Sequence, residues 1–127
     1  MNLRSSLCLL LWGAASVAQA VTPQQVQSVY AAPGSDAFSA QRGASLWSRE
    51  GIEGRQCGTC HGKDLTRSGQ HARTRKDIDP MALSASPSRF SDPAKVEKWF
   101  KRNCKWTWDR ECTSQEKGDL LEFLYQL

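Results

Sequence analysis

The sequence contains few histidines and methionines and no apolar segment long enough to cross a membrane. Among 127 residues there are two histidines and two methionines, and one of these methionines is Met1. The longest apolar run, residues 7–12, is far shorter than the roughly 20 residues that a spanning helix needs. No internal repeat and no nucleic-acid recognition motif is present. We therefore expect one small domain that neither spans a membrane nor binds nucleic acid.

Two further absences narrow the meaning of the closely spaced cysteines Cys57 and Cys60. No second Cys/His pair follows at zinc-site spacing, and no βαβ pattern of a thioredoxin-like protein surrounds them. What is present is CGTCH over 57–61, the C-x-x-C-H signature of covalent haem attachment. In that chemistry the two thiols add to the haem vinyl groups, and His61 binds the iron as the proximal ligand. The motif predicts one covalent haem c.

The first 20 residues read as a secretory signal peptide. Arg4 supplies the charged region, residues 7–12 supply the apolar core, and Ala18-Gln19-Ala20 is an A-x-A cleavage site. The alternative is a membrane anchor that is retained. Cleavage would leave a single cytochrome c domain over residues 21–127, located in the periplasm, an oxidising compartment in which disulfides persist.

The cysteine count fits that compartment. If the signal peptide takes Cys8 with it and haem takes two thiols, Cys104 and Cys112 remain. An even remainder indicates a disulfide, with two separate free thiols as the alternative. A Cys104–Cys112 bond would close a short loop and contribute about 2.5 kcal/mol by the chain-entropy estimate.

Four helices are expected from capping residues and apolar spacing. The first spans 23–32, and the second spans 36–49 with Asp36 as its cap. The third begins at Pro93, and Thr113 opens the last. Residues 62–91 are polar and rich in loop-forming residues. A loop this long needs something to fold around, and haem provides it. We predict an all-α, class I cytochrome c-like fold with haem at its centre. The aromatic side chains are expected either to line the haem or to pack in an ordinary core. They are Trp47, Trp99, Phe100, Trp106 and Trp108.

The second axial ligand of the iron separates the possible functions. A strong ligand such as Met81 gives a low-spin electron carrier, whereas a weak ligand lets small molecules bind. His71 lies in a basic loop, where the alternative to ligation is an exposed side chain. Asn103 continues the apolar face of the third helix, where its amide needs a partner, although it could simply end the helix. The residues alone leave Met81, His71 and Asn103 open.

The stretch from Thr59 to Leu127 resembles the sphaeroides haem protein family, a set of small high-spin c-type cytochromes. The strongest match is Arg102-Asn103-Cys104, with a second cysteine, Cys112, eight residues later. The other matching segments are TCHG at 59–62, TRSGQ at 66–70, PSRF at 87–90, VEKW at 96–99, RECT at 110–113 and EK at 116–117.

The resemblance implies a class I cytochrome fold, with His61 and Asn103 as axial ligands and a Cys104–Cys112 disulfide beside the distal site. It also implies that Asn103 leaves reduced iron and makes room for dioxygen or nitric oxide. The electron partner implied by the family is a diheme cytochrome c. The chain departs from the family pattern at Met81, whose thioether could compete for ferrous iron.

The formal net charge of +4 is concentrated in two segments. In the loop after the haem motif, Arg73, Arg75 and Lys76 are candidate partners of the haem propionates. On the third helix a basic rim could steer an acidic redox partner. That rim comprises Lys95, Lys98, Lys101, Arg102 and Lys105.

These observations favour a periplasmic, high-spin mono-haem cytochrome c that accepts electrons and binds diatomic gases. One alternative is an ordinary low-spin electron carrier with Met81 as ligand. Another is an enzyme that reduces oxygen or nitrogen oxides, against which no acid–base pair is evident around Asn103.

Overall fold

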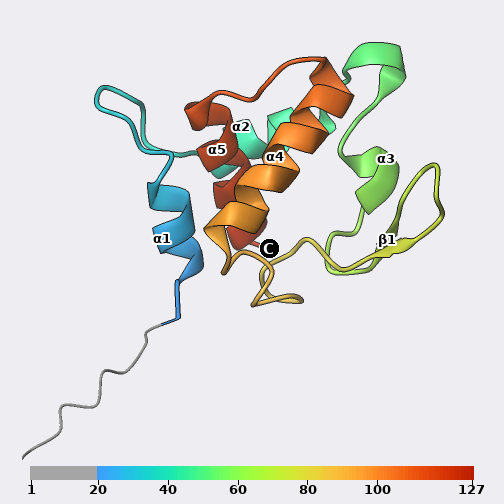
Figure 1. Ribbon diagram of the computed structural model, residues 1–127, viewed down its shortest axis with the longest axis horizontal. Helices are drawn as coiled ribbons and strands as arrows, with labels where there is room; N and C mark the ends of the chain where they lie inside the picture. Colours follow the sequence, from blue (N-terminus) through green and yellow to red (C-terminus); the bar gives the residue numbers. More distant parts are fainter. Residues whose placement is uncertain (1–19) are drawn as a thin grey trace, which may run out of the picture.

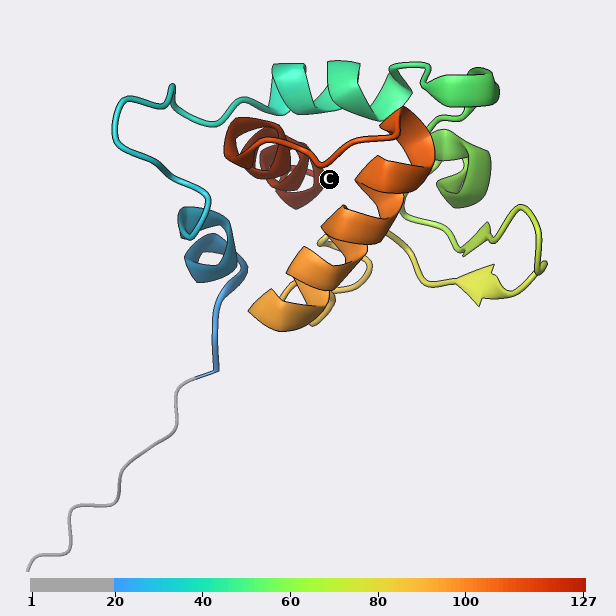
Figure 2. The same ribbon diagram turned by 45° about the horizontal axis from the view of Figure 1, so that its top comes forward.

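The computed structural model describes residues 20–127, so that all of the predicted signal peptide except Ala20 lies outside the described part of the chain. The elements are α1 (Pro23–Ser28), α2 (Ala40–Ser48), the 3₁₀ turn η1 (Ile52–Gly54), α3 (Gly58–His61), β1 (Gly69–Gln70), β2 (Asp77–Ile78), α4 (Pro93–Trp108) and α5 (Ser114–Tyr125). Figures 1 and 2 show an arrangement of helices with one small hairpin at its edge. The all-α expectation is confirmed. Within residues 20–127, no helix is both long and apolar enough to span a bilayer.

Local capping signals set three of the helix starts. Thr22 opens α1 and Thr113 opens α5, each through a capping box with the residue three positions later. At α4 the Asp92 side chain accepts from the Lys95 N–H, and Pro93 occupies the first turn. The expected boundaries were wrong for α1, which ends at Ser28 rather than near residue 32.

The start of α2 also differs from the expectation. Ser39, and not Asp36, caps this helix by accepting from the Arg42 N–H. The Ser39 backbone N–H in turn donates to the buried Asp119 carboxylate of α5 at 2.7 Å. A contact with a residue 80 positions away therefore fixes the helix start.

The helices α2 and α5 form the closest pair in the described chain. They can approach because residue 43 is glycine: a Cβ there would lie 2.0 Å from the Asp119 carbonyl oxygen. The Asp119 carboxylate accepts from Arg42 Nε at 2.7 Å and from Gln115 at 3.1 Å, so the buried charge is paired. Apolar side chains of α5, chiefly Leu121 and Leu124, pack into the core beside this pair.

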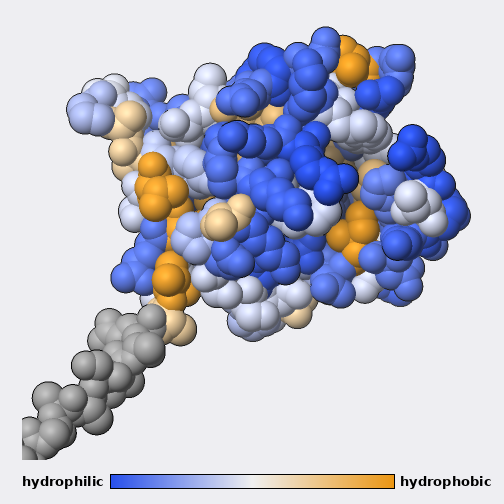
Figure 3. Space-filling model, viewed as in Figure 1, coloured by the Kyte–Doolittle hydropathy of each residue, from blue (hydrophilic) through white to orange (hydrophobic). Residues whose placement is uncertain are grey.

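The segment 62–91, expected to be loop, contains a short antiparallel hairpin in which Gly69 pairs with Ile78 and Gln70 with Asp77. It projects from the helices beside α3 (Figure 2). The face of the molecule shown in Figure 3 is largely hydrophilic, with apolar residues only in scattered places.

Candidate functional site

The single-turn helix α3 carries the attachment motif. Cys57 is its N-cap residue and Cys60 lies within it, and the structure leaves both thiols unpaired and partly buried. Burial raises the pKa of the Cys57 thiol to about 11. Both sulfurs are free and lie on one short turn, as thioether formation with a haem requires.

His61 ends the same turn with a partly buried imidazole whose ring centroid lies 5.4 Å from that of Trp47. Its Nδ1 is buried and has no hydrogen-bond partner in residues 20–127. Burial, with the positive charge of Arg89 as a second cause, lowers its pKa from 6.5 to about 4. The imidazole is therefore neutral at pH 7, which is the protonation state that binds a metal.

Helix α4 has two different long faces. Val96, Cys104 and Thr107 are buried toward the core. A second stripe carries Trp99, which is 45% exposed, and Trp106, which is 37% exposed. Asn103 is exposed and lies four residues after Trp99 and three before Trp106, so the three side chains share one face of the helix.

These features fit a haem. The attachment turn offers two free thiols and a neutral imidazole whose buried nitrogen lacks a partner. On α4 the aromatic stripe with an amide at its middle is the kind of surface that a flat, largely apolar macrocycle covers. In Figures 1 and 2, α3 lies beside the C-terminal half of α4, although these two helices are not among the closely packed pairs of the described chain.

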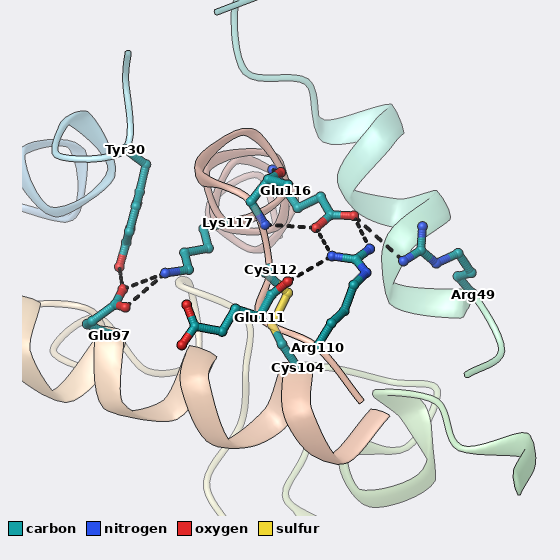
Figure 4. The surroundings of a disulfide bond; sticks show 10 residues. Tyr30, Arg49, Glu97, Cys104, Arg110, Glu111, Cys112, Glu116 and Lys117 are labelled. Atoms are coloured by element: carbon teal, nitrogen blue, oxygen red, sulfur yellow. Dashed lines mark hydrogen bonds and ion pairs between the residues drawn. A yellow bond between two sulfur atoms is a disulfide. The ribbon is translucent and has the colours of Figure 1, made fainter. Parts of the chain in front are cut away.

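The disulfide predicted between Cys104 and Cys112 is present, with the two Cα atoms 5.7 Å apart. It joins the residue after Asn103 to the segment that leads into α5 (Figure 4). Near it, the Trp108 ring lies 4.4 Å from the guanidinium carbon of Arg49 and 5.6 Å from that of Arg110. The C-terminal end of α4 is thus held both covalently and by stacked cations.

The other proposed iron ligands have different settings. Met81 is partly buried against the core, and its backbone N–H donates to the Leu65 carbonyl at 2.9 Å. His71 is exposed in the hairpin turn, where its Nδ1 accepts from the backbone N–H groups of Arg73 and Thr74. The turn therefore already uses one nitrogen of His71.

The three cations proposed to bind propionates all lie exposed in the hairpin. Only Arg75 lines the open groove of about 650 Å³ that the hairpin forms with Cys60, while Arg73 and Lys76 do not. The Ala72 N–H lies 3.4 Å from Cys60 Sγ, which attaches the turn to the cysteine side of the motif. These cations are thus grouped beside a thioether position.

Sequence reasoning gave no role to Arg89. This side chain is partly buried, and its charge acts on His61. The available signal was its place next to the apolar Phe90, which is 5% exposed.

Comparisons with known proteins agree with this geometry. Residues 33–124 match the family described as a domain of unknown function, DUF1924. The chain is 45% identical over 107 residues to the cytochrome c-type protein SHP of Cereibacter sphaeroides, covering 81% of this chain and 82% of that protein. It is 31% identical over 68 residues to cytochrome c″ of Methylophilus methylotrophus, covering 54% and 47%.

Solved structures of the same two proteins share the fold. Oxidised SHP, described as an oxygen-binding cytochrome c, superposes with a TM-score of 0.78 at 42% identity, covering 86% of this chain and all of that one. Oxidised cytochrome c″ gives a TM-score of 0.69 at 26% identity, covering 80% and 91%.

Proposed function

This chain belongs to the DUF1924 family and to the sphaeroides haem protein family, and on that premise we propose that it is a periplasmic, high-spin cytochrome c with an opening distal site. Like its relatives it is a class I-like cytochrome that carries haem c. Cys57 and Cys60 hold that haem through thioether bonds, and His61 binds its iron. When bound, the haem supplies one-electron redox chemistry and a coordination position for diatomic gases.

Asn103 is the distal ligand in this proposal. The observation that carries it is the position of Asn103 at the middle of the exposed Trp99–Trp106 stripe, directly before a disulfide-bonded cysteine. A neutral amide oxygen is a weak, hard donor that suits ferric iron better than ferrous iron. With haem bound, Asn103 would release the iron on reduction and leave the position open to dioxygen or nitric oxide. The description of SHP as an oxygen-binding cytochrome c supports the gas-binding part of this proposal.

The bulky neighbours of Asn103 define which ligands can enter. Trp99 and Trp106 flank the amide on the same face, and both are large and rigid. They leave room for a diatomic molecule more readily than for a bulky one. The electrons come from another redox protein, for which a diheme cytochrome c is the proposed donor.

Optical spectra of the haem-loaded protein test the proposal, recorded oxidised, reduced, and reduced with nitric oxide. We expect a high-spin ferric spectrum and rapid nitric oxide binding after reduction. Asn103→Ala should change the ferric spectrum, whereas Met81→Leu should leave it unchanged. A low-spin spectrum with a far-red methionine–iron band that Met81→Leu abolishes would contradict the proposal and identify a plain electron carrier.

A further inference from the structure

Arg89 is a cation without an anionic partner inside the described chain. Its side chain is partly buried, and burial lowers its pKa. No ion pair within residues 20–127 includes it, whereas four other arginines each pair with a carboxylate. Those four are Arg42, Arg49, Arg55 and Arg110. A charge withdrawn from water without a partner is costly, so an anion from outside the polypeptide is expected near Arg89.

The backbone around Arg89 is fixed by its neighbours. The Phe90 ring is buried and packs edge-on against Tyr125 at 5.3 Å between centroids. The Arg89 N–H donates to the Ser86 carbonyl at 3.0 Å, and α4 begins four residues later. Arg89 is therefore held at a defined place rather than on a free loop.

Two charged or titratable groups face Arg89. Its positive charge helps to lower the pKa of His61, so the guanidinium is close enough to the proposed iron ligand to act on it. Asp79 is the acidic side chain whose charge acts on Arg89, but the two do not approach within ion-pair distance. Neither group supplies the missing acceptor.

Haem chemistry distinguishes Arg89 from the hairpin cations. The porphyrin carries its vinyl groups on two neighbouring pyrroles and its two propionates on the other two. The hairpin with Arg73, Arg75 and Lys76 contacts Cys60, and so lies beside a vinyl position. The loop that leads into α4 lies apart from that hairpin in both ribbon views (Figures 1 and 2).

We infer that Arg89 binds a haem propionate from the His61 side, through the two-pronged hydrogen bonding that a guanidinium offers to a carboxylate. The inference rests on the proposed attachment at Cys57, Cys60 and His61. A haem carboxylate there would give Arg89 the partner that the polypeptide lacks. In return, Arg89 would keep that propionate ionised and add a positive charge near the iron.

The reduction potential of the haem-loaded protein, measured from pH 4 to pH 9, tests this. Ionisation of a propionate appears as a step in the potential. Removal of a cation within about 4–6 Å of a carboxylate raises its pKa by roughly one to three units, so Arg89→Met should move the step upward by that amount. Arg75→Met tests the competing prediction from the sequence, that the hairpin cations bind the propionates, and should leave the step in place if Arg89 is the partner. Asp79→Asn should move it slightly downward, because it removes a negative charge.

A step that stays in place in Arg89→Met, or that moves as far in Arg75→Met, would overturn the inference. Arg89→Lys covers the case in which the methionine variant fails to fold. Lysine keeps the positive charge but cannot form two parallel hydrogen bonds to a carboxylate. The pH of the step in reduction potential should therefore change little, while the propionate bending mode in the resonance Raman spectrum shifts. An unchanged bending mode in Arg89→Lys would also contradict the contact. The ferric spectrum and nitric oxide binding report on Asn103, so failure there remains distinguishable from failure of this inference.

Discussion

The guanidinium of Arg110 donates two hydrogen bonds of 2.7 Å each to the carboxylate of Glu116. Arg110 lies inside the loop closed by the disulfide, and Glu116 lies in the first turn of α5 (Figure 4). The same carboxylate accepts from the Thr113 backbone N–H at 2.9 Å, as half of the capping box. One side chain thus ties the disulfide loop to the start of a core helix.

Replacement of Glu116 by Gln should destabilise the protein by about 1–3 kcal/mol, because it removes the charged partner of Arg110 and weakens the cap. Urea unfolding of the haem-loaded protein measures the change. Glu50→Gln is the control, since that exposed carboxylate has no hydrogen bond or ion pair in the described chain; it should change stability by less than about 0.5 kcal/mol. Equal effects of the two substitutions would show that the bidentate pair contributes nothing specific.

Removal of the disulfide should cost about 2.5 kcal/mol, the chain-entropy estimate for a loop with a sequence separation of 8. The variant is Cys104→Ala with Cys112→Ala, compared with the parent by urea unfolding. A stability unchanged within error would contradict the structural role of this bond.

Substitution of Gly43 by Ala should be strongly destabilising. The added Cβ would meet the Asp119 carbonyl at 2.0 Å, so α2 and α5 would have to separate. Overpacking of this kind typically costs about 1–3 kcal/mol. Gln41→Ala, on the exposed side of the same helix, controls for helix propensity and should be nearly neutral. Thermal unfolding followed by circular dichroism separates the two; similar melting temperatures would show that the helices have room for the methyl group.

Acid should weaken the contact between α2 and α5 through Asp119. Burial raises its pKa, but hydrogen bonds from Arg42, Ser39 and Gln115 outweigh burial and leave the pKa below its ordinary value of 3.8. A carboxyl with a depressed folded-state pKa contributes stability above its unfolded pKa and loses it as the pH falls through the folded value. This contribution is therefore complete at pH 7 and is lost progressively as the pH falls below about 4, the unfolded pKa, toward the lower folded value.

Arg42→Met tests that dependence by urea unfolding at pH 7 and at pH 3. The variant should be less stable than the parent at pH 7, and the difference should shrink at pH 3, where protonation of Asp119 begins to weaken the interaction in the parent. Arg73→Met, at an exposed hairpin position without an ion pair in the described chain, should show no such convergence. If the difference in unfolding free energy between Arg42→Met and the parent stays constant with pH, the Arg42–Asp119 pair contributes no pH-dependent stability.

Much of the fold could be predicted because its signals are local. The caps at Thr22, Asp92 and Thr113 are short motifs whose partners lie three residues away. The attachment motif is likewise contiguous over 57–61. Such features need no knowledge of the rest of the chain.

The parts that could not be predicted depend on distant residues. The start of α2 moves from Asp36 to Ser39 because the Ser39 N–H finds the Asp119 carboxylate. The hairpin has strands of only two residues, too short for an alternating pattern, and a bond from Ala72 to Cys60 helps to position it. Arg89 lies in an irregular segment, where no helical or strand periodicity could have predicted that its side chain is partly buried.

The covalent bond at Cys104 also bears on how quickly the site could respond to an electron. Asn103 belongs to a helix whose end is closed by that bond and by the stacking of Arg49 and Arg110 on Trp108. Under the proposed ligation, the backbone at Asn103 has little room to move, and only rotation about its own side-chain bonds remains. Such rotations take picoseconds to nanoseconds, whereas helix displacements take microseconds or longer. Movement of the Asn103 side chain would then add almost no delay, and the rate of gas binding would be set by the arrival of the electron.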